Sequence, residues 1–83
     1  MKKADISLSV RTPESVVYEG LVKAVSSYND KGVFDVLPYH SNFISIIKNF
    51  LKVYQTNGQI REFNVVSGVM RVYKNRVEVF LGI

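Results

Sequence analysis

Apolar and polar residues alternate along most of this 83-residue chain, and this two-residue period constrains the fold more than any other feature. The alternation is clearest over Ile6–Arg11, Met70–Tyr73 and Arg76–Leu81. Successive side chains of a β-strand point to opposite faces, so the pattern predicts half-buried strands. No segment has a sustained period of about 3.6 residues, and we therefore expect little or no helix.

Turn signals separate the apolar segments at intervals of about eight to twelve residues, a spacing typical of antiparallel all-β domains. The residues expected to form these turns are Pro13, Gly20, Pro38, Asn57, Gly58 and Gly68, of which Gly68 is also expected to mark a bulge or sharp bend. Asn57-Gly58 predicts a two-residue hairpin turn, because both positions of such a turn require positive φ. We therefore expect a single domain over residues 1–83, an all-β antiparallel sandwich or flattened barrel of about eight or nine short strands.

Three segments carry finer expectations. Strict alternation over Leu21–Tyr28 predicts that Val22 and Val25 face opposite sides of their strand. Phe43–Ile47 fits a strand or a helix by periodicity, but its β-branched residues favour a strand. The longer stretch Phe34–Phe50 has more apolar side chains than one small core needs. Most of these should be core residues, and the remainder would serve an interface with a partner or with a second copy of the chain.

Composition excludes several kinds of reactive site. The chain has no cysteine and a single histidine, His40, which excludes a disulfide framework and a metal site built from Cys or several His ligands. No set of nucleophile, base and orienting residue can be identified. The glycines are dispersed and none opens a helix, so no phosphate-binding loop is expected. We therefore predict no catalytic, cofactor or metal site, and expect His40 to tie its loop to backbone or to a partner.

Apolar runs are short throughout the chain. Asp5, Ser7 and Ser9 interrupt the sequence after Lys2-Lys3, so the start of the chain does not resemble a signal peptide. No run reaches the length of about 18 apolar residues that a transmembrane helix needs. We therefore expect no direct insertion into a membrane.

The formal net charge of +4 comes from scattered basic residues rather than from a block. A sheet face with Tyr54, Arg61 and Tyr73 could stack on single-stranded nucleic acid and contact its phosphates. An ordinary solvated face is the favoured interpretation, and nucleic acid is not the expected partner. The alternative kept open is a stand-alone β-sandwich module that binds nucleic acid or protein.

Several short motifs follow one another in a recognisable order. Thr12-Pro13-Glu14 precedes an apolar run that ends at Tyr18-Glu19-Gly20, and Val65–Gly68 precedes Met70-Arg71-Val72. The remaining matching positions are Gly32, Phe34, Val36, Leu37, Pro38, His40, Asn75, Val77 and Val79. In this order and spacing the chain resembles the amino-terminal β-sandwich of the epsilon subunit of F-type ATP synthases, which is called delta in mitochondria.

The resemblance implies a non-catalytic subunit of the central stalk, which links the gamma subunit to the c-ring and couples ion-driven rotation to ATP synthesis. It implies that Lys31, Gly32 and Val33 face the c-ring. The positions that match residues near gamma and the ring are Thr12, His40, Ser41, Asn42 and Phe43. It also implies a peripheral position on the cytoplasmic side of an energy-coupling membrane, the inner membrane of a bacterium.

The chain departs from the family pattern at a few positions. Asp35 and Tyr39 stand where the family usually has glycine, and Lys31 stands where it often has an acidic residue. Family members commonly continue into a carboxy-terminal pair of helices, whereas this sequence ends at Ile83. The resemblance therefore implies the structural role and not the inhibitory role of those helices, for a chain that is either a naturally short subunit or a shortened piece of a longer one.

Overall fold

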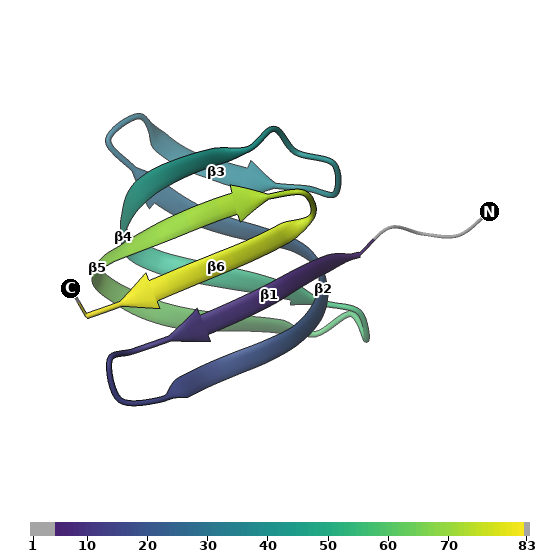
Figure 1. Cartoon of the computed structure of the whole chain (residues 1–83), viewed down its shortest axis with the longest axis horizontal. Coiled ribbons are helices and arrows are strands. Elements are labelled where there is room, and N and C mark those ends of the chain that lie inside the picture. The colour runs from purple at the N-terminus through teal and green to yellow at the C-terminus, as the bar shows by residue number, and fades with distance from the viewer. Residues whose placement is uncertain (1–4, 83) are drawn as a thin grey trace.

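The computed structural model describes residues 5–82, so the expectation placed on Lys2-Lys3 lies outside the described part. Residues 5–82 form six β-strands (Figure 1), and no helix among them is long and apolar enough to cross a membrane. The strands are β1 (Ile6–Arg11), β2 (Val16–Asn29), β3 (Gly32–Val36), β4 (Phe43–Gln55), β5 (Ile60–Tyr73) and β6 (Arg76–Leu81). The all-β prediction is confirmed.

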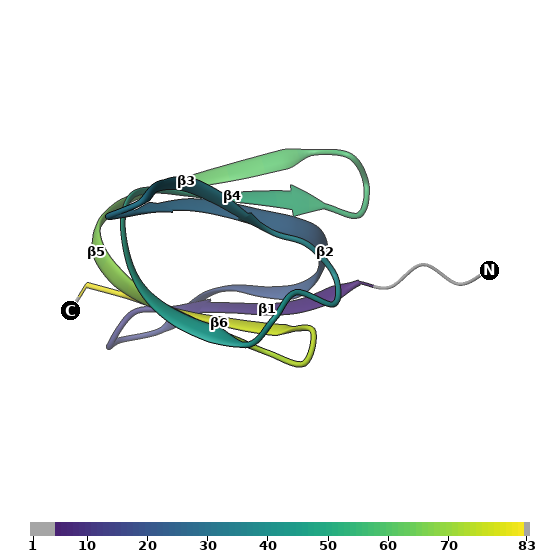
Figure 2. The same cartoon turned by 90° about the horizontal axis from the view of Figure 1, so that it is seen from above.

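Five strands close into a ring in the order β1-β6-β5-β4-β2, because β1 pairs with β2 as well as with β6. β1 and β6 are parallel, and the other pairings are antiparallel. β3 extends the sheet as an additional strand on β2. Figure 2 shows the ring edge-on as a flattened loop, with β3 on one side and β1 and β6 on the other. The architecture is therefore a flattened barrel with one added strand.

The long strands β2, β4 and β5 each run from one side of this ring to the other. The first half of β2 pairs with β1, and its second half pairs with β3 and β4. The prediction of eight or nine strands is wrong, because Gly20, Asn49 and Gly68 do not end strands. These residues lie inside β2, β4 and β5, where each strand continues. The expectation that Gly20 and Gly68 lie in turns is therefore also wrong, whereas the expectation of a bulge or sharp bend at Gly68 is confirmed, because Gly68 borders the register shift of β5 on β4.

Register shifts explain how the long strands bend from one side of the ring to the other. Between Val22 and Ala24, β2 has one residue more than the facing part of β4. This bulge resets the alternation, so Val22 and Val25 both face the core, and the prediction that they face opposite sides is wrong. In β5, the step from Val65 to Gly68 spans three residues where Ile47–Asn49 on β4 spans two. Bulges of this kind increase twist and bend a strand locally.

Two hairpin turns differ from the sequence expectation in their geometry. Gly58 has a φ of 89°, and its N–H donates to the Gln55 carbonyl across 3.1 Å. Asn57 is not among the positive-φ residues, so the predicted two-residue turn is wrong, and a longer loop between Gln55 and Ile60 forms instead, with positive φ at Gly58. Lys74 and Asn75, with φ of 49° and 60°, form the tight two-residue turn between β5 and β6.

Apolar side chains from all six strands fill the interior of the ring. The buried core residues are Ile6, Leu8, Val10, Val22, Val25, Val36, Ile47, Leu51, Val53, Val65, Met70, Val72, Val77 and Val79. Buried Ser27 is satisfied, because its hydroxyl donates to the Phe50 carbonyl across 2.7 Å. Gly68 is needed for close approach, since a Cβ there would lie 2.8 Å from the Phe80 carbonyl oxygen. This packed interior gives the surface loops a stiff base.

Candidate docking surface

The β2–β3 hairpin displays the first predicted contact set, Lys31, Gly32 and Val33. Asn29 and Gly32 face each other across the hairpin, and Asp30 and Lys31 form its tip. The Lys31 N–H donates to Asn29 Oδ1 across 2.9 Å, an Asx turn that satisfies the tip amide. Gly32 has a φ of 113°, which other residues adopt only with strain. The tip therefore has a defined backbone and exposes the side chains of Lys31 and Val33.

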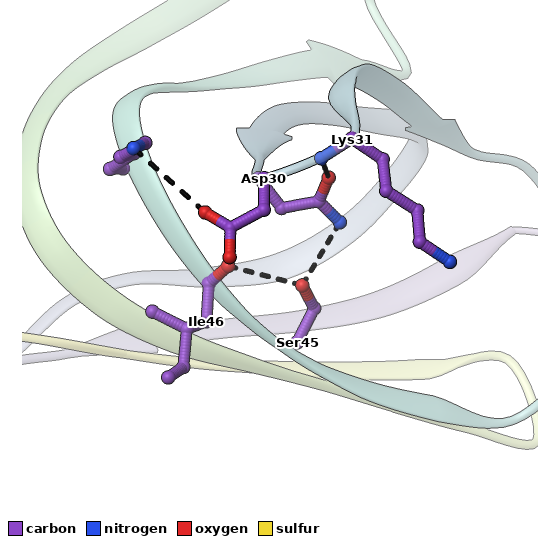
Figure 3. Close-up of polar contacts among 6 residues, drawn as sticks. Asp30, Lys31, Ser45 and Ile46 are labelled. Atoms are coloured by element: carbon purple, nitrogen blue, oxygen red, sulfur yellow. Dashed lines mark hydrogen bonds and ion pairs between the residues drawn. The ribbon is translucent and has the colours of Figure 1, made fainter.

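Side-chain contacts tie this tip to the first half of β4 (Figure 3). Asn29 Nδ2 donates to Ser45 Oγ across 3.1 Å, and Ser45 Oγ donates to the Ile46 carbonyl at the same distance. Asp30 lies 3.9 Å from Lys48 Nζ. That ion pair is solvent-exposed, so it contributes little stability, and the hydrogen bonds of Asn29 position the tip.

The tip and β4 enclose an open depression of about 420 Å³. Its lining residues are Asn29, Asp30, Lys31, Phe43, Ile44, Ser45 and Ile46. Ile44 and Ile46 are 70% and 72% exposed, although they belong to a regular strand. The depression thus combines exposed apolar side chains with charged residues at one rim, an arrangement suited to a protein surface.

The second predicted contact set lies in the β3–β4 loop and at the start of β4. His40 Nδ1–H donates to the Ser41 carbonyl across 2.8 Å, and the His40 ring lies 5.0 Å from the Phe43 ring. Asn42 Oδ1 accepts a hydrogen bond from the Lys74 N–H across 3.1 Å. This His40 bond stays within its own loop, so the expectation that His40 ties the loop to backbone or to a partner stays a prediction. Four of the predicted residues, from His40 to Phe43, therefore form one fixed loop.

The same loop contains a residue in the left-handed region. Tyr39, next to Pro38, has a φ of 65°, and its side chain is 82% exposed. Its N–H donates to Asn75 Oδ1 across 2.5 Å, so the β5–β6 turn holds the loop in this conformation. The departure from glycine at this position therefore costs conformational strain, whereas Asp35 lies in β3 without positive φ.

Thr12 is not brought together with the His40 loop. The Thr12 Oγ1 accepts hydrogen bonds from the N–H groups of Glu14 and Ser15 across 3.3 and 3.2 Å, which shapes the β1–β2 turn around Pro13. Figure 1 shows the β1–β2 turn and the β3–β4 loop at opposite ends of the long axis. The β2–β3 tip lies at the same end as the β1–β2 turn.

The proposed aromatic and basic face does not exist in the described part of the chain. Tyr54 lines a depression with Ser26, Asp35 and Leu37, whereas Tyr73 lines another with Arg71. The Arg61 guanidinium lies 5.6 Å from the Tyr18 ring and 5.3 Å from the Phe63 ring, both of which pack against the core. Tyr54, Arg61 and Tyr73 therefore do not form one stacking surface.

An apolar row on the outer side of the ring escaped the sequence reasoning. Ile46 pairs with Val69, which pairs in turn with Phe80, so the three side chains share one face across β4, β5 and β6. Phe80 is 37% exposed, and Val69 is half-buried. We call Ile46, Val69 and Phe80 the apolar row. Apolar residues at outward-facing positions could have indicated an exposed apolar surface from the sequence. The sequence does not show that these residues are neighbours, because that depends on the strand register.

The candidate surfaces present contact groups rather than a reactive centre. Within residues 5–82, no group of three His, Cys, Asp or Glu side chains is placed to hold a metal ion. What the surface offers is a lysine ammonium, exposed isoleucines and fixed loop backbones, which are groups for binding another protein.

Comparison with known sequences gives a consistent result. Residues 5–81 match the profile of the ATP synthase delta/epsilon chain β-sandwich domain. The ATP synthase epsilon chain of Helicobacter pylori is 34% identical over 74 residues, which cover 89% of this chain and 60% of that protein. The epsilon chain of Clostridium botulinum is 33% identical over 76 residues, 90% of this chain and 57% of that protein. The chain thus spans about three-fifths of the length of these relatives.

Solved structures share the fold at low sequence identity. A chain in the Euglena gracilis mitochondrial ATP synthase structure with OSCP, F1 and c-ring superposes with a TM-score of 0.88 at 18% identity, covering 95% of this chain and 51% of that one. A chain in the Tetrahymena thermophila mitochondrial ATP synthase central stalk and c-ring structure gives 0.78 at 14% identity, covering 100% and 67%.

Proposed function

The chain belongs to the family of ATP synthase delta/epsilon chain β-sandwich domains, and from this premise we propose that it is a non-catalytic subunit of the rotor of an F-type ATP synthase. The match over residues 5–81 carries the proposal, because it includes all six strands and the loops between them. In this role the chain links the gamma subunit to the c-ring and couples ion-driven rotation to ATP synthesis.

The two partners are assigned to different surfaces of the flattened barrel. The β2–β3 tip, with Lys31, Gly32 and Val33, faces the c-ring. The apolar row faces gamma, because a contiguous exposed apolar face is typical of a permanent protein interface. By the resemblance, the loop from His40 to Phe43 would lie near gamma and the ring, and the Thr12 turn, at the opposite end of the barrel, would lie near gamma.

The mechanism is mechanical rather than chemical. The interior is tightly packed and the contact loops are fixed by hydrogen bonds, so a force applied at one surface reaches the other with little deformation. A closed ring of strands also leaves few unpaired edges that could open under load. The chain thus acts as a rigid wedge that makes the ring and gamma rotate together.

The complex is membrane-associated, and we propose that the chain lies on the cytoplasmic side of a bacterial inner membrane. Its own surface contributes no ligand set for a cofactor in this proposal, so nucleotide chemistry belongs to other subunits. A stand-alone nucleic-acid module is the less favoured function, because the aromatic and basic residues on which it rested are dispersed.

Co-expression with the gamma subunit of the same genome tests the proposal. Size-exclusion chromatography is expected to give co-elution in a one-to-one complex, and a labelled single-stranded oligonucleotide is expected not to bind. Separation of the two proteins at micromolar concentration, together with oligonucleotide binding that weakens as salt rises, would instead favour the nucleic-acid module.

A further inference from the structure

The loop between β4 and β5 contains a residue pair, Asn57-Gly58, whose chemistry the rotor role does not use. Residues 56–62 are all exposed, and Figure 2 shows this green hairpin extending beyond the flattened ring. An asparagine followed by glycine can lose ammonia without an enzyme, because the next backbone nitrogen attacks the side-chain carbonyl carbon. A side chain on the following residue hinders this attack, and glycine has none.

Two hydrogen bonds orient the Asn57 side chain for such an attack. The Gln59 N–H donates to Asn57 Oδ1 across 2.9 Å, so a donor already lies where negative charge develops on that oxygen. Asn57 Nδ2, the leaving nitrogen, donates to Gln59 Oε1 across 3.5 Å. The turn therefore combines an electrophilic carbon, a neighbouring nucleophile and a hydrogen-bond donor for the oxyanion.

The backbone at Gly58 has room to bring its nitrogen to the side chain. Its φ is 89°, and apart from its chain neighbours no heavy atom lies within 4 Å of a Cβ placed there. The Gly58 N–H donates to the Gln55 carbonyl across 3.1 Å, and this bond must open before the nitrogen attacks. Because the loop is exposed, water replaces the bond at little cost, and opening requires no unfolding of the barrel.

The other asparagines of the chain lack this combination. Each is followed by a residue with a side chain, in the pairs Asn29-Asp30, Asn42-Phe43, Asn49-Phe50, Asn64-Val65 and Asn75-Arg76. The side chains of Asn29, Asn42 and Asn75 hydrogen-bond to segments distant in the sequence. Asn49 and Asn64 lie in the paired strands β4 and β5. These positions are controls within the same molecule.

We propose that Asn57 is a site of spontaneous deamidation in the folded protein. The Gly58 nitrogen bonds to Asn57 Cγ and passes its proton through water to Nδ2, and the Cγ–Nδ2 bond breaks with release of ammonia. Water then adds to one of the two carbonyls of the cyclic imide and breaks its bond to the ring nitrogen, which yields aspartate or isoaspartate. Water is the only co-reactant, and nothing is oxidised or reduced.

Either product changes the β4–β5 hairpin. The new carboxylate lowers the formal net charge of +4 by one. Isoaspartate also adds a methylene group to the main chain within the loop that the Gln55 N–H closes by donating to the Gln59 carbonyl across 2.9 Å. The modification is therefore expected to loosen this end of the hairpin. The inference depends on the loop alone and does not rest on the proposed function.

Incubation of the purified chain at mildly alkaline pH tests the inference. Peptide mass spectrometry is expected to show conversion at Asn57 at least about tenfold faster than at any other asparagine, because hindrance at the attacking nitrogen raises the barrier elsewhere. In isotopically labelled water the product should gain one labelled oxygen, and an isoaspartyl methyltransferase should methylate it. Ion exchange of the intact protein should give acidic species for the unmodified chain and for Asn64→Gln, the matched control, but not for Asn57→Gln.

Three results would overturn the inference. The first is conversion at Asn57 no faster than at Asn64 in the folded protein. The second is conversion at Asn57 only after unfolding in urea, which would show that the bonds to Gln55 and Gln59 protect the site. The third is the same rate of acidic species in Asn57→Gln as in the unmodified chain, which would place the reaction at another residue.

Discussion

The β2–β3 tip and the apolar row are two surfaces of one barrel, and different interactions fix their shapes. The tip has turn residues whose backbone is fixed by an Asx turn and by a hydrogen bond from Asn29 to Ser45. The row belongs to regular strands, and its side chains are aligned by the pairing of Ile46, Val69 and Phe80. The first surface owes its shape to side-chain hydrogen bonds, and the second to strand register.

This difference indicates how the two surfaces would recognise partners. A charged tip with an open depression contributes specificity and a fast, salt-sensitive encounter, whereas an apolar row contributes affinity. Ile46 belongs to both surfaces, since it lines the depression and pairs with Val69. Each substitution proposed below changes one of these surfaces, or the residues that hold it in place, and leaves the other surface unchanged.

Gly68→Ala is expected to have the largest effect, because the added methyl group would push apart the two strands beneath the apolar row. The new Cβ would lie 2.8 Å from the Phe80 carbonyl oxygen and 3.1 Å from Leu81 Cδ2. We expect a loss of about 1–3 kcal/mol in the free energy of unfolding, measured by chemical denaturation. Val66→Ala, in the same bulge but 96% exposed, should be nearly neutral. A Gly68→Ala protein as stable as the unmodified chain would show that the row does not depend on this close approach.

Phe80→Ser tests the row through its side chain rather than its backbone. Loss of this aromatic contact is expected to weaken binding to gamma by about 1–2 kcal/mol, because large aromatic residues dominate protein interfaces. Isothermal titration with purified gamma measures the change. Val66→Ser is the matched control on the neighbouring strand, and an equal loss in both variants would argue against a localised row.

Asn29→Ala tests the support of the tip. The substitution removes the bonds to the Lys31 N–H and to Ser45 Oγ, and we expect a stability loss of about 1 kcal/mol. Hydrogen exchange of the Lys31 amide is expected to become faster. Asn57→Ala removes a similar turn bond to the Gln59 N–H in the β4–β5 hairpin and should leave exchange at Lys31 unchanged. Unaltered exchange in Asn29→Ala would mean that the tip is positioned by something else.

Tyr39→Gly is expected to have the smallest effect, and it should be stabilising. Tyr39 adopts a φ of 65° with its side chain 82% exposed, so glycine relieves strain and removes few contacts. The gain, about 0.5–1 kcal/mol, is reduced by the greater flexibility of glycine in the unfolded chain. Differential scanning calorimetry measures it, and a clear fall in Tm would show that the tyrosine side chain contributes packing.

The sequence was a good guide where strands are regular and a poor one where they bend. Alternation correctly predicted the buried residues of Ile6–Val10 and Arg76–Val79, because the side-chain period is unbroken there, and the register shift of β1 on β2 comes only between Val10 and Arg11. Val22 and Val25 were misassigned, since a single extra residue inverts the pattern beyond it. Glycine occurs both in turns and at bends, so Gly20 suggested a strand end that the fold does not have, whereas Gly68 was correctly expected at a bulge or sharp bend.

The candidate surfaces were predictable to a similar extent. Local motifs located the β2–β3 tip and the His40 loop, because turn chemistry is readable over a few residues. The tie from Asn29 to Ser45 and the row through Ile46 and Phe80 depend on long-range register, which a sequence pattern does not specify.

The most direct test of two separate surfaces is one assembly assay with both partners. Gamma and the c-ring are presented together to the unmodified chain, to Lys31→Glu and to Phe80→Ser, and the amount of each partner retained is measured. We predict that Lys31→Glu loses the ring and keeps gamma, whereas Phe80→Ser loses gamma and keeps the ring. If folded variants lose both partners in parallel, or retain both fully, then the chain does not link gamma to the ring through two distinct surfaces.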